Sequence, residues 1–112
     1  MTNPIREARP ANEPLVSHYA DDPELRGLIA GFVSALPDRI DAIRRATERL
    51  DRPAVQRLTH QLKGAAGSYG FAPISELAGD LESATRESVT DDDLARCLEA
   101  LAALCARALA PA

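Results

Sequence analysis

The apolar residues of this chain recur mostly at spacings of three and four, which is the period of one face of an α-helix. No stretch alternates between apolar and polar residues as a half-buried strand would. Between about residues 22 and 105 the pattern divides into five helical segments joined by short connections. Because short connections favour antiparallel neighbours, we expect an all-α fold: an antiparallel up-down-up-down four-helix bundle with an additional N-terminal helix.

The boundaries of the first three segments follow from capping residues and prolines. Asp22 followed by Pro23 predicts the first helix start, and Pro37 restarts or kinks the chain before the second segment. Asp51 with Pro53 opens the third helix, which should end near Gly70. The inward faces predicted for the first two segments are Leu25, Leu28, Ile29, Phe32 and Val33, then Ile40, Ile43, Thr47 and Leu50.

The last two segments also have start signals. Pro73 opens the fourth helix, and Thr90 with Asp93 resembles a capping box for the fifth, with aspartate in place of the usual glutamate. The inward faces predicted here are Ile74, Leu77, Ala78 and Leu81 in the fourth helix, and Leu94, Cys97, Leu98, Leu101, Leu104 and Cys105 in the fifth. Cys97 and Cys105 lie about 12 Å apart along one helix, too far for a disulfide with each other, so buried free thiols are expected.

Length and composition indicate one small domain with an aliphatic core. Residues 1–14 contain three prolines and predict a flexible N-terminal arm, either a linker remnant or the natural start of a free-standing protein; residues 15–112 form the bundle domain. The net charge of −4 argues against nucleic acid as a partner. No apolar run of 18 residues and no signal peptide is present, so we expect a cytoplasmic protein that does not bind membranes. A monomer is expected because no spare apolar face is evident.

His60 lies on the third helix, opposite the middle of that helix's apolar stripe. The stripe consists of Val55, Leu58, Leu62, Ala65, Ala66 and Tyr69. Gly64 and Gly67 share the face of His60, and Lys63 flanks it. Glycine in a helix interior costs roughly 1 kcal/mol relative to alanine. Two glycines beside an outward imidazole therefore indicate a surface kept bare for the close approach of a partner.

A neutral imidazole nitrogen is a nucleophile that needs no separate base, so an exposed histidine can carry a phosphoryl group. A lysine one turn away would offset part of the added negative charge. The chain has no glycine-rich phosphate loop for ATP, which predicts that it does not phosphorylate itself. His18 and His60 are its only histidines and lack metal-ligand spacing, so no metal site is expected. The arginines interleaved with acidic residues from 38 to 52 are typical of a solvated face.

The run from His60 to Gly67 resembles the signature of histidine-containing phosphotransfer (HPt) domains. That signature is histidine, any residue, leucine, lysine, glycine, two small residues and a further glycine. The run from Tyr19 to Leu25 is similar to the entry into the first bundle helix of these domains, and the resemblance covers roughly residues 15 to 110.

The resemblance implies a phosphorelay intermediate that is not an enzyme. His60 would accept a phosphoryl group at Nε2 from a receiver-domain aspartate and pass it to another response-regulator receiver. Lys63 would steady that group, and Gly64 would permit close approach. Gln61, Gly67 and Ser68 would border the docking partner. The partners would be response-regulator receivers and a hybrid sensor histidine kinase, with Mg²⁺ in the receiver and no cofactor in this chain.

Two other hypotheses stay open at this point. The chain could be a non-catalytic helical-bundle module that docks on a receiver or kinase domain, although an intact His60 argues against this. It could also be a terminal module cut from a hybrid sensor kinase, which would share the chemistry and differ in context. A phosphotransfer assay separates carrier from docking module.

Overall fold

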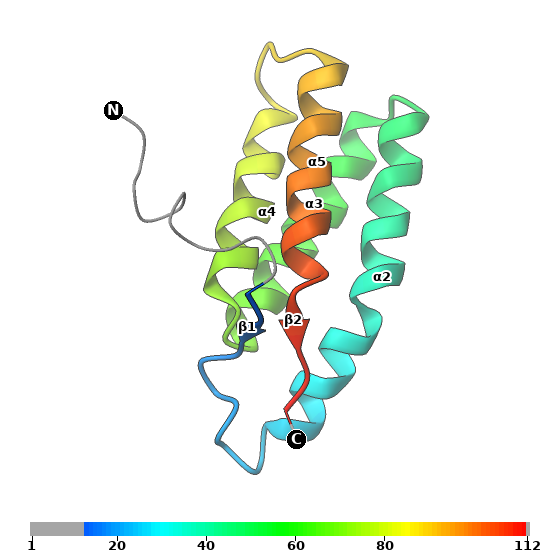
Figure 1. The fold of residues 1–112 in the computed structure, drawn as a ribbon. Coiled ribbons are helices and arrows are strands. Elements are labelled where there is room, and N and C mark those ends of the chain that lie inside the picture. Colours follow the sequence, from blue (N-terminus) through cyan, green and yellow to red (C-terminus); the bar gives the residue numbers. More distant parts are fainter. Residues whose placement is uncertain (1–12, 112) are drawn as a thin grey trace, which may run out of the picture.

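The computed structural model describes residues 13–111, and this part of the chain is mostly helical, which confirms the all-α fold class. Its elements in chain order are β1 (Leu15–Val16), α2 (Arg26–Glu48), α3 (Arg52–Ser68), α4 (Ala72–Ala84), α5 (Asp91–Cys105) and β2 (Ala108–Leu109). Helix α3 packs against α2 and α4, and α5 packs against the same two helices. Figure 1 shows the four helices side by side, with successive helices running in opposite directions.

The predicted additional N-terminal helix is not seen in residues 13–111, because the first two predicted segments form the single helix α2 with Pro37 inside it. A proline in a helix interior costs about 3 kcal/mol. One apolar stripe nevertheless continues through Pro37 at helical spacing, and its burial outweighs that cost. The buried residues of this stripe are Ile29, Phe32, Leu36, Ile40, Ile43 and Ala46.

Two residues predicted to face inward in these segments do not. Leu28 is 55% exposed and Leu50 is 64% exposed. Leu50 lies beyond the end of α2 in the left-handed region, with φ of 58°, so its side chain is outside the helical stripe that the periodicity assumed. Leu36, which the prediction left out, takes an inward place instead.

The predicted helix starts are correct for three of the four helices of residues 13–111. The Asp51 side chain accepts a hydrogen bond from the Ala54 N–H in α3, and Thr90 Oγ1 accepts one from the Asp93 N–H in α5. Pro73 stands in the first turn of α4. The prediction for α2 was wrong, because Asp22 accepts from the N–H of Glu24 in a turn and the helix begins only at Arg26.

Two short strands that the sequence did not predict join the ends of the described chain. Strand β1 pairs with β2 in parallel, with Leu15 opposite Ala108 and Val16 opposite Leu109. Leu15 is 6% exposed and belongs to the core, which holds the chain before α2 against the bundle (Figure 1). Of the predicted flexible arm, residues 1–14, all but Glu13 and Pro14 lie outside the described residues.

The core is mostly aliphatic and includes the rings of Phe32 and Phe71, and both cysteines are free thiols. Cys105 is buried and Cys97 is half-buried. Burial raises the pKa of Cys105 to about 12, so this thiol is a poor nucleophile at neutral pH. Within residues 13–111, no helix has the length and apolar character that crossing a membrane requires.

Candidate functional site

Helix α3 places His60 at the surface because its apolar residues pack on the other side. Its buried residues are Ala54, Val55, Thr59, Leu62 and Ala66. The hydroxyl of Thr59 donates to the backbone oxygen of Val55 at 2.8 Å, which satisfies this polar group inside the core. The His60 side chain is 71% exposed. The imidazole is therefore carried on a well-packed helix and remains accessible.

A buried carboxylate from the neighbouring helix holds one nitrogen of the ring. Nδ1 of His60 lies 2.9 Å from Oε2 of Glu82 in α4, whose side chain is 8% exposed. A carboxylate accepts hydrogen bonds, so this contact places the ring proton on Nδ1. Nε2, on the other side of the ring, then has a free lone pair and no partner among residues 13–111.

Two cations also approach the same carboxylate. Nη2 of Arg86 lies 3.0 Å from Oε2 of Glu82, and Nζ of Lys63 lies 4.0 Å from Oε1. Both cations are exposed, at 55% and 51% of their side chains. A buried carboxylate is costly without compensating charge, and these contacts supply it. Lys63 has the longer contact with Glu82 and is therefore the more loosely held of the two cations.

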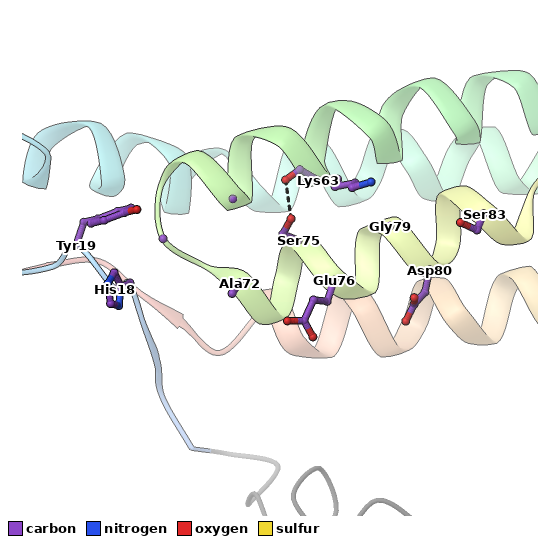
Figure 2. Close-up of a pocket in the computed structure, with 11 residues that line it drawn as sticks. His18, Tyr19, Lys63, Ala72, Ser75, Glu76, Gly79, Asp80 and Ser83 are labelled. Carbon is purple, nitrogen blue, oxygen red and sulfur yellow. Dashed lines mark hydrogen bonds between the residues drawn. The ribbon is translucent and has the colours of Figure 1, made fainter.

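Two surface hollows lie near or at His60. The larger has a volume of about 770 Å³ and lies between α3, α4 and the segment before α2. Its lining residues are His18, Tyr19, Lys63, Gly67, Gly70, Ala72, Ser75, Glu76, Gly79, Asp80 and Ser83. Figure 2 shows Lys63 running along its upper edge and the Ser75 hydroxyl hydrogen-bonded to the Lys63 backbone oxygen, a contact of 2.9 Å.

The smaller hollow includes His60 itself. It has a volume of about 520 Å³ and is lined by Pro53, Gln56, Arg57, His60, Gln61, Glu82 and Arg86. Arg57 and Arg86 line this hollow together with the imidazole, while Lys63 lines the larger hollow. Cations in the neighbourhood of an imidazole suit the binding of a phosphoryl group.

The other predicted site residues are spread over different surroundings. Gly64 is exposed, and a Cβ built on it would meet nothing within 4 Å. Gly67 faces α4, where a Cβ would lie 3.4 Å from the Ser75 hydroxyl oxygen. Gln61 lines the smaller hollow, whereas Ser68, the last residue of α3, is exposed and lines neither hollow.

Sequence reasoning missed Ser75, Gly79 and Glu82 of α4, and also Arg86, which lies in the turn after that helix. A signal for Glu82 was present: it follows Ala78 by four residues and so falls on the inward stripe of α4, where a carboxylate needs a partner. The sequence did not indicate that the partner is His60 on another helix. In residues 13–111 there is no group of three His, Cys, Asp or Glu side chains that could hold a metal ion.

Comparison with known protein families decides the classification. The Hpt domain family matches residues 27–110, which include α3, α4, α5 and all of α2 except its first residue, Arg26. The chain belongs to the Hpt domain family. Hpt domains are phosphocarrier modules of histidine phosphotransfer in two-component signalling, and they interact with response-regulator receiver domains. No curated protein and no solved structure matches this chain.

Proposed function

We propose that His60 is the phosphoacceptor of this Hpt domain. It takes a phosphoryl group from the aspartate of one receiver domain and passes it to the aspartate of another. The contact that carries this proposal is the 2.9 Å approach of Glu82 Oε2 to Nδ1 of His60. It fixes the tautomer and leaves the nucleophilic Nε2 on an imidazole that is 71% exposed.

The transfer step needs no proton acceptor. Nε2 attacks the phosphorus in line, the bond from phosphorus to the aspartyl oxygen breaks, and the receiver keeps its carboxylate. The ring retains its Nδ1 proton and gains positive charge, which the carboxylate of Glu82 offsets. Mg²⁺ belongs to the receiver in this proposal, and this chain supplies no cofactor. The same step reversed delivers the group to the second receiver.

The surroundings of Nε2 support this assignment. Lys63, 4.0 Å from Glu82, steadies the phosphoryl group while Arg86 continues to balance the buried carboxylate. Gly64, with nothing within 4 Å of its Cβ position, lets the receiver's phosphoacceptor pocket come close. Gln61, Gly67 and Ser68 are the further residues that contact the docked receiver in this proposal.

In this proposal the phosphoryl group originates on a hybrid sensor histidine kinase and the Hpt domain performs no ATP-dependent step. It works as a monomer in the cytoplasm. The alternative is a helical module that docks on a receiver or kinase without accepting a phosphoryl group. The hydrogen-bonding contact between Glu82 and His60 favours the phosphocarrier role, since a docking module has no need to orient an imidazole.

The test is phosphoryl transfer from a phosphorylated receiver to the wild-type chain, to His60→Gln and to His18→Gln. His18 is the other histidine of the chain, so its variant is the matched control. We expect acid-labile phosphate on the wild type and on His18→Gln, and none on His60→Gln. Helical content should be unchanged in all three, because both side chains are exposed. Transfer to His60→Gln, or no transfer to the wild type, would contradict the proposal.

A further inference from the structure

Lys63 and Gly79 come from neighbouring helices, and the lysine side chain lies across the glycine. A Cβ built on Gly79 would lie 3.4 Å from Cδ of Lys63, 3.5 Å from Cε and 3.8 Å from Nζ. Figure 2 shows the Lys63 side chain leaving α3 and extending in the direction of Gly79 on α4. The outer half of the lysine therefore rests on bare backbone at position 79.

The position of Gly79 on α4 gives this contact its importance. Gly79 precedes Glu82 by one helical turn, and the Nζ of Lys63 ends 4.0 Å from Oε1 of Glu82. Lys63 itself follows His60 by one turn on α3. The path over Gly79 thus brings the ammonium group to the carboxylate that binds His60.

The helix backbone does not require glycine at position 79. Among the glycines of residues 13–111, a positive φ occurs only at Gly70, so Gly79 has a backbone conformation open to any residue. Glycine in a helix interior is disfavoured relative to alanine. Lys63 occupies the space next to Gly79, and a larger side chain at position 79 would compete with it for that space.

We propose that Gly79 is a positioning residue for Lys63, an inference that rests on phosphoryl transfer at His60. The bare backbone holds the ammonium group beside Glu82 and within reach of a phosphoryl group on His60. Alanine would only touch the lysine, because a Cβ fits at 3.4 Å. A longer side chain would occupy the path and push Lys63 off α4 into solvent.

The experiment measures phosphorylation of His60 by phosphoramidate, a small donor that needs no docking surface. Its P–N bond breaks, the bond from Nε2 to phosphorus forms, and ammonia leaves. The variants are Gly79→Leu, Lys63→Met and the double variant. Gly31→Leu is the matched control, because Gly31 is an exposed glycine inside α2 with nothing within 4 Å of its Cβ position.

We expect Gly79→Leu and Lys63→Met each to slow labelling of His60 by about tenfold, the loss of one charge-assisted contact. The double variant should be no slower than Lys63→Met, since the glycine acts through the lysine. Gly31→Leu should react as the wild type does. Circular dichroism should show all variants folded, and a variant that does not fold is replaced by Gly79→Gln.

Two different outcomes separate this inference from the proposed function. Labelling of Gly79→Leu at the wild-type rate, or a further loss in the double variant, would overturn the positioning role of Gly79 alone. No labelling of the wild type, or labelling mapped to a residue other than His60, would overturn the phosphoacceptor assignment itself.

Discussion

Glu82 is a carboxylate on the inward face of α4, and its burial is explained by the residues that touch it. The side chain is 8% exposed, and His60, Lys63 and Arg86 all approach its oxygens. A hydrogen-bonded carboxylate of this kind fixes the orientation and the tautomer of a histidine. In the proposed transfer Glu82 positions His60 and does not touch the phosphoryl group.

Replacing Glu82 with glutamine should keep the size of the side chain and remove its charge. The ring of His60 then loses the negative charge that offsets the phosphorylated imidazole, so we expect transfer from a phosphorylated receiver to slow by roughly 10–100-fold. Glu76→Gln, at an exposed position of the same helix, is the control and should transfer normally. Stopped-flow or rapid-quench rates on both variants decide the matter, and an unchanged rate for Glu82→Gln would remove Glu82 from the mechanism.

At the scale of elements, the connection between α3 and α4 is tight and depends on Gly70. This residue has φ of +84°, in the left-handed region, and its backbone oxygen accepts a hydrogen bond from the His18 N–H at 2.8 Å. A Cβ at Gly70 would lie 2.6 Å from Ser17 Oγ and 2.9 Å from His18 N. The chain before α2 therefore passes too close to this connection for any side chain there.

Gly70→Ala should lower the free energy of unfolding by about 1–3 kcal/mol, since it adds backbone strain and a clash. Gly64→Ala is the opposite case, because nothing lies within 4 Å of the Cβ position and the residue is inside α3. That variant should gain up to ~1 kcal/mol from helix propensity. Urea denaturation of both variants measures the difference. Equal stabilities would show that the contact between this connection and residues 17–19 is not tight in solution.

At the scale of the whole molecule, residues 13–19 connect the beginning of the described chain to the ends of two helices. The Leu15 N–H donates to the Arg107 backbone carbonyl at 2.7 Å, and Arg107 Nε donates to the Glu13 backbone carbonyl at 2.7 Å. Ser17 Oγ donates to the backbone oxygen of Tyr69. This segment therefore joins the end of α5 to the end of α3, and it forms the wall of the larger hollow at His18 and Tyr19.

Leu15→Ala should lower the free energy of unfolding by about 2–4 kcal/mol, because Leu15 is 6% exposed and its removal leaves a cavity. Val16→Ala is a matched control on the same strand, since Val16 is 55% exposed and should change stability by less than about 0.5 kcal/mol. Chemical denaturation of the two variants tests whether β1 is part of the folded core. Similar small losses in both would mean that β1 contributes little to stability.

Much of the fold followed from interactions within three or four residues. Asp51, Pro73 and Thr90 mark helix starts by satisfying or removing backbone N–H groups, and these predictions were confirmed. The stripe of α3 likewise predicted that His60 is exposed. The prediction that a new helix starts at Pro37 was wrong. It considered the local cost of a proline inside a helix but left out the buried apolar stripe that continues through Pro37. Strands of two residues, as in β1 and β2, have no periodicity to detect.

The sequence by itself determined where α3, α4 and α5 begin, most of the residues that each helix buries and that His60 faces outward, because helix periodicity and caps are local properties. The tertiary structure decided which side chains surround His60. Glu82 follows it by 22 residues, and Gly79 lies beneath Lys63 from another helix. Such contacts depend on how α3 and α4 are rotated and offset against each other, and that packing is set by the whole core.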